Sequence, residues 1–465
     1  IFCWGDVAYR LLARPWLPPA RALRIGLAWV FGCGLVSWAV FIGLWAGLSL
    51  TAAVTVLSVA GGVLWLLSAV LDRRTSHTPA LALAAGSSVQ TASETSPWTV
   101  VFALVILIQI GLVALAAWAS PLTDWDAWLN WASKANVIFI DQRLSAGAYN
   151  DPARLPTNLD YPLLLPLVEA WFYTWLGRIH EPVIGLISWL FYGSLLLLFY
   201  QAARELGPPP VALGFTALLA TVPRLERMGH NGMADVPLAA LVLSAFLLLH
   251  YDRSRRSPSG LSRRIVALAL AAGLMPWLKT EGWLWLALAG AVWLIGLGRD
   301  VRGNRLGGGQ ALAALAVYGG VALALGGAWQ LFLAVQGTQR FTFFPLTPAT
   351  FAANAWRLPW IAGAMLRRLL NPFWNFIWLF AGLTLLARRG RALTGPAGWL
   401  IVPVAGYVIG VSLSFVFSRF DPYLAHLNNS AERLVLQAAP LALWWLLGQA
   451  VAVGWVPNSR LEVQP

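Results

Sequence analysis

Long hydrophobic runs without charge are the feature that most constrains this chain. They recur along nearly its whole length, and most approach the roughly 20 apolar residues that a helix needs to cross a hydrocarbon layer of about 30 Å. Only 11% of the 465 residues are charged, against about 25% in ordinary soluble proteins. The sequence therefore excludes a soluble domain of normal size and predicts an all-α, polytopic membrane helical bundle.

Twelve segments carry this signal, so the bundle is expected to have about 12 transmembrane helices. An even number of crossings places both termini on the same side of the membrane. The predicted helices are Ile25–Leu44, Leu48–Leu71, Trp98–Trp118, Pro182–Tyr200, Pro210–Thr221, Val236–His250, Ile265–Leu278, Gly282–Leu297, Ala311–Val335, Pro372–Leu386, Ala397–Val416 and Leu434–Val453.

The charge of the chain is unevenly distributed between the two sides. Its net charge is +13, and arginine runs at 253–256, 299–305 and 388–391 all fall in loops on the side of the N-terminus. The positive-inside rule makes that side cytoplasmic, in a bacterial-type inner or plasma membrane. Because topology accounts for these arginines, we expect membrane lipids and no nucleic acid as partners.

Neither the cysteines nor the first residues indicate further chemistry. Cys3 and Cys33 have no metal-ligand spacing, so a disulfide framework or a zinc site is not expected. The chain begins at Ile1 with neither an initiator methionine nor a cleavable signal pattern, as a fragment or a trimmed product would.

The opposite, outer side carries the two longest intervals between predicted helices, Ser120–Glu181 and Gln336–Asn371. Long loops between membrane helices often hold functional residues. In the first interval, Trp125 and Trp128 belong to a set of apolar residues at helical spacing, which predicts an amphipathic helix in the membrane interface. A second interfacial helix is expected over Leu163–Leu176.

Two carboxylates stand at the start of the first interfacial helix. Thr123 is placed to cap it, and Asp124 and Asp126 fall in its first turn, where negative charge meets the positive end of the helix dipole. The same pair, beside a lipid surface, suits a general base or a metal ligand acting on a lipid-linked substrate. Both interpretations stay open at this point.

Further ionisable groups lie on the outer side at or near helix ends. Charges there are costly and usually paired, so Lys279 with Glu281, or Glu432 with Arg433, can be local salt bridges. Lys279 is one of only two lysines in the chain, and an ammonium group is a compact charge for phosphate. The candidate set is Asp160, which is also a plausible turn residue before Tyr161-Pro162, and Asp235, Lys279, Glu281, His426 and Arg433.

In order and placement, these motifs resemble the GT-C superfamily of polytopic glycosyltransferases, in particular bacterial protein O-mannosyltransferases and aminoarabinose transferases. The resemblance covers residues 98–465 and leaves residues 1–97 as a basic segment with an added helix pair. It rests on Asp124-Trp125-Asp126-Ala127-Trp128, Asp160-Tyr161-Pro162-Leu163-Leu164, Ala234-Asp235-Val236-Pro237, Lys279-Thr280-Glu281-Gly282 and Glu432-Arg433-Leu434.

The resemblance implies an enzyme, a hexosyl- or pentosyltransferase that uses a polyprenyl-phosphate sugar at the outer face. The acceptor would be a hydroxyl of a glycan, a lipid or a protein. Asp126, or failing that Asp124, would be the base. The family often has an Asp-Glu pair where this chain has aspartates separated by Trp125, so either carboxylate fits the role.

Other residues receive supporting roles from the same resemblance. Asp160, Asp235 and Glu281 would orient the acceptor or the basic groups, while Lys279, Arg433 and His426 would bind phosphate. Some relatives hold a divalent metal, and Asp124, Asp126 and Asp235 are the ligands available for Mg²⁺ or Mn²⁺.

Two other functions are compatible with the sequence. A ligase or polymerase of lipid-pyrophosphate-linked glycans would also place arginines against phosphate groups. A transporter or flippase without chemistry would instead be expected to show inverted repeats and interrupted helices in matching halves, and no convincing repeat is found.

Overall fold

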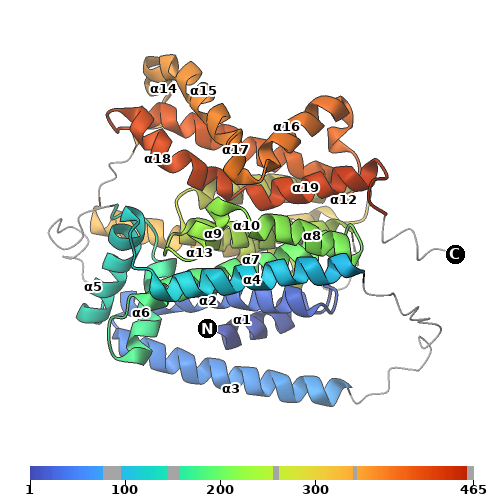
Figure 1. Cartoon of the computed structure of the whole chain (residues 1–465). Coiled ribbons are helices and arrows are strands. Elements are labelled where there is room, and N and C mark those ends of the chain that lie inside the picture. The colour runs from blue at the N-terminus through green and yellow to red at the C-terminus, as the bar shows by residue number, and fades with distance from the viewer. Residues whose placement is uncertain (77–95, 145–157, 255–260, 339–342, 458–465) are drawn as a thin grey trace.

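The computed structural model describes residues 1–76, 96–144, 158–254, 261–338 and 343–457. The described residues form a helical bundle whose long helices run side by side (Figure 1). Ten of the twelve predicted segments coincide with a helical segment, and the other two are divided. Nine helices are long and apolar enough to cross a membrane, or ten if a bent pair forms one span. The described part of the chain is thus a multi-pass membrane bundle, and a count of about twelve stays a prediction.

The long helices are α2 (Arg21–Trp45), α3 (Leu50–Ser76), α4 (Pro97–Ala119), α7 (Pro182–Arg204), α10 (Asp235–Ser254), α11 (Leu261–Leu278), α12 (Gly282–Arg302), α13 (Gly308–Gln336) and the span Gly398–Phe417, which contains α17 (Ile401–Ser414). Shorter helices complete the bundle: α8 (Pro209–Ala220), α16 (Ile377–Arg388), α18 (Tyr423–Leu436) and α19 (Ala439–Ala452).

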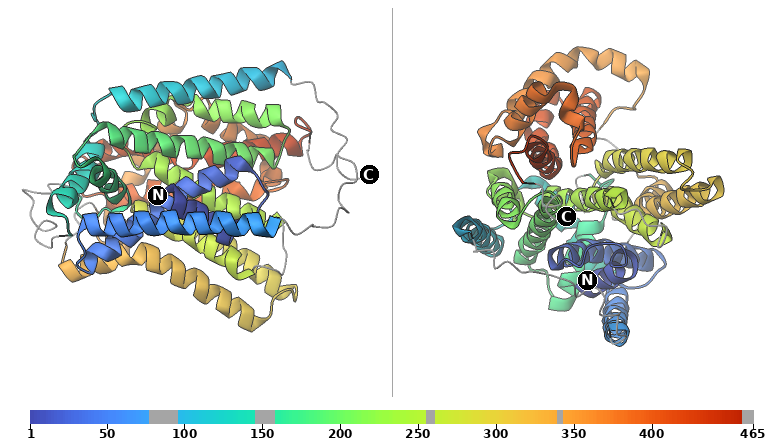
Figure 2. Two further views of the ribbon diagram at one scale, coloured as in Figure 1. Left: turned by 90° about the horizontal axis from the view of Figure 1, so that it is seen from below. Right: turned by 90° about the vertical axis from the view of Figure 1, so that its right-hand side faces the viewer.

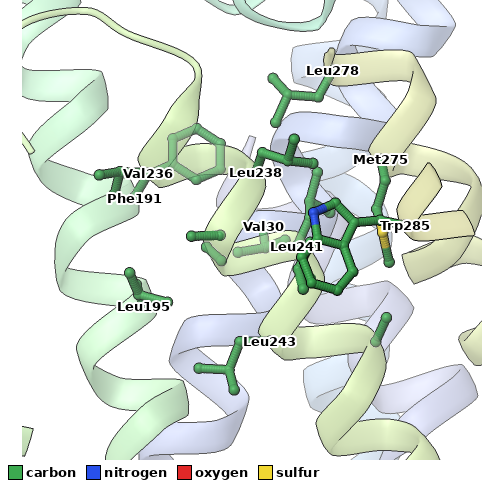
Figure 3. Packing of buried hydrophobic residues seen from close by; sticks show 14 of the residues in the cluster. Val30, Phe191, Leu195, Val236, Leu238, Leu241, Leu243, Met275, Leu278 and Trp285 are labelled. Carbon is green, nitrogen blue, oxygen red and sulfur yellow. The ribbon is translucent and has the colours of Figure 1, made fainter. Parts of the chain in front are cut away.

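Helix α10 lies at the centre of the bundle. In its most hydrophobic window 94% of the residues are buried, and Val236, Leu238 and Leu241 pack between α7, α2 and α12 (Figure 3). By contrast, only 11% of the corresponding windows of α3 and α4 are buried. These two helices lie at the periphery (Figure 2), where their apolar surfaces suit contact with lipid.

Two predicted spans differ from the observed helices. The segment Pro372–Leu386 is interrupted because Asn375 and Phe376 adopt positive φ angles of 49° and 59°, so α16 begins at Ile377. The segment Leu434–Val453 is two helices, α18 and α19, bent by 48°. Pro440 stands at the start of α19, and its ring cannot continue the preceding helix without a clash.

The first outer interval contains the two expected helices. One begins at Trp125, passes through a π-helical segment, η2 (Asp126–Ala132), and continues as α5 (Ser133–Asp141). The other is α6 (Leu164–Leu176). Both are steeply inclined to the long helices at one end of the bundle (Figure 1). Most of α6 is buried, whereas Trp125 and Trp128 are 65% and 59% exposed, as interface anchors would be.

Three short helices lie at the same end of the bundle. Helix α9 (Pro223–Met228) follows α8, while α14 (Pro348–Asn354) and α15 (Leu358–Leu369) occupy the second outer interval. A short N-terminal helix, α1 (Phe2–Ala8), packs against the middle of α2 and of α3. We call the end that carries η2, α9 and α15 the loop end.

Candidate functional site

An ion pair between two helix termini lies deep within the loop end. Lys279 Nζ is 2.8 Å from Asp235 Oδ1 and 3.5 Å from Glu281 Oε1. The side chains of Lys279 and Asp235 are 6% and 0% exposed. Burial opposes the charge on Lys279, but Asp235 and Glu281 outweigh it and raise the pKa of the ammonium group above its ordinary value. Lys279 therefore stays charged.

Local backbone geometry brings these groups together. Gly282 closes the turn after Lys279, and a Cβ atom there would lie 2.1 Å from the carbonyl oxygen of Met275. Gly232 has a φ of +77° and precedes Asp235 by three residues; this left-handed conformation favours glycine. Both turns therefore depend on glycine, which explains how the short Lys279–Glu281 segment can face the first residue of α10.

Gln437, which follows the last residue of α18, completes the surroundings of Asp235. Trp285 Nε1 and Tyr407 OH donate to Gln437 Oε1 at 3.3 and 2.5 Å. This arrangement directs the amide nitrogen of Gln437 toward Asp235 Oδ1, at 3.0 Å. Trp285 and Tyr407 also stack with ring centroids 4.1 Å apart. Gln437 is thus held in one orientation by two aromatic donors.

A second ion pair joins the first interfacial helix to α18. Arg433 donates to Asp126 Oδ2, and its other contacts are to Asn429 O at 3.3 Å and Ser430 Oγ at 3.4 Å. Arg433 also lies 3.9 Å from the sulfur of Met233, in the loop before α10. Arg433, which contacts Asp126, and Gln437, which contacts Asp235, are four residues apart at the end of α18. The end of this helix therefore links the two carboxylates.

Asp124 forms a third pair nearby. Its carboxylate accepts from Arg227 of α9 at 3.0 Å and from Asn231 at 2.5 Å. The π-helical segment η2 has no side-chain cap and has Asp126 in its first turn, so the predicted cap by Thr123 is not found while Asp126 lies where it was expected. Both aspartates of the motif also bind arginines from distant parts of the chain.

Glu432 forms a separate cluster with two arginines. It accepts from Arg224 of α9 and from Arg368 of α15, the latter at 2.9 Å. Consecutive residues of a helix face different directions, so Glu432 and Arg433 reach different partners. The local Glu432–Arg433 salt bridge considered as an alternative is therefore wrong. We call Arg224, Arg227 and Arg368 the arginine rim; their side chains are 24%, 56% and 33% exposed.

The two remaining candidates from the sequence, Asp160 and His426, lie near these ion pairs. Asp160 lies in the turn before α6, where Trp329 Nε1 donates to its carbonyl oxygen at 2.8 Å. His426 Nδ1 is 2.8 Å from Ser418 Oγ, and its ring lies among those of Phe343, Phe415 and Phe420. The hydrogen-bonded partner of His426 is thus a serine in an aromatic environment.

The interior of the site contains two carboxylate oxygens without a hydrogen-bond donor among the described residues. Asp235 Oδ2 and Glu281 Oε2 are buried and have no hydrogen-bond partner among the described residues. Buried polar atoms are almost always satisfied. Two unsatisfied acceptors within one ion-pair network therefore indicate a place where a ligand donates hydrogen bonds.

The three carboxylates expected to hold a metal do not form a ligand set. Asp124, Asp126 and Asp235 each bind a different cationic side chain. Across the described ranges, no group of three or more His, Cys, Asp or Glu side chains is arranged to hold a metal ion. The residues as arranged do not fit a divalent ion, and no chemical step is derived through one.

Sequence reasoning singled out Arg368, in the basic pair Arg367-Arg368, as a contact for lipid headgroups or phosphate, but it missed Arg224, Arg227 and Gln437. The segment Pro223-Arg224-Leu225-Glu226-Arg227 carried a usable signal, because two arginines three residues apart follow a predicted span at its outer end. Gln437 gave no such signal, since its role depends on donors from two other helices.

No family model matches the chain, and no curated protein matches it in sequence. Two crystal structures of ArnT, an aminoarabinose transferase of the GT-C superfamily, from Cupriavidus metallidurans are similar in structure. The structure bound to undecaprenyl phosphate has a TM-score of 0.49 and 18% identity, over 77% of this chain and 60% of that one. The apo structure has a TM-score of 0.46 and 17% identity, over 76% and 59%.

The chain thus spans about three fifths of the length of the solved structures it matches. Its described residues define an all-helical, multi-pass membrane protein. Its structural neighbours come from the superfamily that the sequence motifs resemble.

Proposed function

We propose that the chain is a membrane glycosyltransferase that moves a sugar from a polyprenyl-phosphate donor to an acceptor hydroxyl at the outer face. The observation that carries the proposal is the junction at α18, where Arg433 binds Asp126 and Gln437 binds Asp235. This junction gathers a carboxylate able to accept a proton, a cation for phosphate and unmatched oxygens for hydroxyl groups. The motifs that resemble glycosyltransferases contribute these same residues.

The proposed step is an inverting displacement. The acceptor oxygen attacks the anomeric carbon and forms the new glycosidic bond, while the bond from that carbon to the phosphate oxygen breaks. The proton of the acceptor hydroxyl passes to Asp126, or to Asp124 in its place. The lipid phosphate leaves with the bonding electron pair, and as a weak base it requires no general acid.

The charges around the site favour Arg433 and the arginine rim for the phosphate. We call the five side chains Asp126, Asp235, Glu281, Lys279 and Arg433 the inner group. Its three carboxylates outnumber its two cations, so it carries one net negative charge. Among the described residues, the printed ion pairs of the rim arginines are with Asp124 and Glu432, and these five side chains together carry one net positive charge. A phosphate on the rim side of Arg433 would therefore meet attraction, and the fork of N–H groups on arginine can bind phosphate while still contacting Asp126.

The inner carboxylates would bind the sugar or the acceptor. Asp235 Oδ2 and Glu281 Oε2 are acceptors without donors, and hydroxyl groups of a sugar supply such donors. Lys279 lies between Asp235 and Glu281, which supports a role in holding their negative charge. The sequence-based assignment of Lys279 and His426 to phosphate stays a prediction.

A second candidate function has its own supporting observation. The three rim arginines and Arg433 offer more guanidinium N–H groups than one phosphate group requires, and such a set of donors suits a pyrophosphate-linked glycan donor. A ligase or polymerase of such glycans would depend strongly on Arg224 and Arg368. Transfer from labelled polyprenyl-phosphate sugars and from polyprenyl-pyrophosphate glycans, measured side by side in proteoliposomes, separates the two functions.

We expect product only from the monophosphate donor. Product only from the pyrophosphate donor would replace the first proposal by the second. If neither donor is consumed, while the lipid is moved between leaflets, the protein is a flippase and both proposals fail.

A further inference from the structure

A buried lysine outside the proposed catalytic set holds the turn that leads into α6. Lys134, on α5, is fully buried. Its ammonium group donates to the carbonyl oxygens of Asn158 at 2.8 Å and Tyr161 at 2.9 Å. Lysine is rarely buried without a carboxylate partner. A buried lysine that binds two backbone carbonyl groups therefore indicates that the position of this turn matters.

The same turn is held from a second direction. Trp329, on α13, donates from its indole nitrogen to the carbonyl oxygen of Asp160 at 2.8 Å. Asn158 donates from its side chain to Asn130 Oδ1 at 3.0 Å and has a positive φ of 38°, a conformation uncommon outside glycine. Donors from α5 and α13 thus fix three of the four carbonyl groups in the turn Asn158–Tyr161.

The turn carries Tyr161 into the vicinity of the site. The ring of Tyr161 packs edge-on against Trp131 of η2, with centroids 5.5 Å apart. Burial and the nearby carboxylates of Glu281 and Asp126 raise the pKa of the phenol well above its usual range. The phenol therefore keeps its proton and can only act as a hydrogen-bond donor or a neutral acceptor, never as a base.

The two hydrogen bonds from Lys134 to the turn do not depend on whether its amine is protonated. Burial lowers the pKa of Lys134 to about 7, against an opposing effect of Asp160. An ammonium group has three N–H bonds and a neutral amine has two, so both hydrogen bonds persist in either state.

We propose that Lys134 is a positioning residue which, together with Trp329, fixes the turn Asn158–Tyr161 so that the Tyr161 phenol donates a hydrogen bond to a substrate oxygen beside Asp126 and Arg433. This inference rests on the proposed function for its substrate. The fixed turn itself is independent of that function and can be measured without substrate.

The kinetic test uses Tyr161→Phe, Lys134→Met and the double variant in the transfer assay. Loss of one hydrogen bond to the substrate lowers kcat/KM by about tenfold, and we expect each single variant to show this loss. Because both act through the same phenol, the double variant should be no slower than the slower single variant. Ser133→Ala, whose hydroxyl bonds to Leu129 O within its own helix, is the matched control and should transfer at the wild-type rate.

Wild-type transfer by Lys134→Met, or losses that multiply in the double variant, would overturn the inference. Multiplied losses are what a general structural defect at Lys134 would produce, because such a defect would not act through Tyr161.

The structural test compares amide hydrogen exchange of the peptide around residues 158–163, without substrate, in wild type, Lys134→Met and Trp329→Phe. We expect faster exchange in both variants and no change in Ser133→Ala. If Lys134→Met does not fold, Trp329→Phe removes the other donor to the same turn and decides the outcome. Unchanged exchange overturns the role of Lys134, whereas absent transfer by wild type with normal exchange results overturns only the proposed function.

Discussion

Lys279 and Asp235 form a contact of 2.8 Å in which one carboxylate oxygen is bound and the other has no partner among the described residues. The contact joins the end of α11 to the start of α10, two helices whose residues are largely buried. A buried pair of this kind is sensitive to the loss of either member, because the remaining charge is left without compensation.

We therefore expect Lys279→Met to destabilise the protein strongly, by about 3 to 5 kcal/mol as for other broken buried pairs. The double variant Lys279→Met/Asp235→Asn should recover most of this loss, since no charge is stranded. Thermal unfolding in detergent measures both effects. A double variant as unstable as the single one would contradict the pairing.

Chelation tests the interpretation of the three aspartates. Because Asp124, Asp126 and Asp235 each bind a cationic side chain, we expect transfer to continue at an unchanged rate after dialysis against EDTA. Loss of transfer that returns on addition of Mg²⁺ or Mn²⁺ would show that the aspartates rearrange around a metal ion.

The stability of the protein should depend on pH through Lys134. Its folded pKa of about 7 lies below the ordinary lysine value of 10.5, so between these values the unfolded chain binds more protons and stability rises with pH. From pH 7 to pH 9, Lys134 should contribute about 2 kcal/mol of added stability. The wild type should therefore gain more thermal stability over this interval than Lys134→Met. Equal gains in the two proteins would contradict the burial of Lys134 as a titrating group.

Hydrophobic length was sufficient to predict most of the fold. Ten of the twelve predicted spans coincide with a helical segment, because a run of apolar residues in lipid can satisfy its backbone hydrogen bonds only within itself. The errors fall where local conformation decides: Phe376 follows Asn375 into a left-handed conformation that is rare for phenylalanine, and Pro440 separates α18 from α19.

The candidate site was predicted as a set of residues but not as a set of pairs. Asp126 and Arg433 were both expected at the outer side, yet they are 307 positions apart, and no local pattern states which carboxylate meets which arginine. Of the two local pairs considered as alternatives, Lys279–Glu281 forms at 3.5 Å, whereas Glu432 and Arg433 contact partners on different helices. Partners such as Arg227 and Gln437 depend on helix packing, which a single sequence does not specify.

The central claim is that the carboxylate bound by Arg433 accepts the proton during sugar transfer. The most direct measurement is transfer from a labelled polyprenyl-phosphate sugar by Asp126→Asn and Asp124→Asn, with Asp300→Asn at the opposite end of α12 as the control. We predict a fall in kcat of about 10² or more for Asp126→Asn, a wild-type rate for Asp300→Asn, and little change in the KM for the donor. Full activity in Asp126→Asn would contradict the claim; loss of activity in Asp124→Asn instead would assign the proton transfer to Asp124.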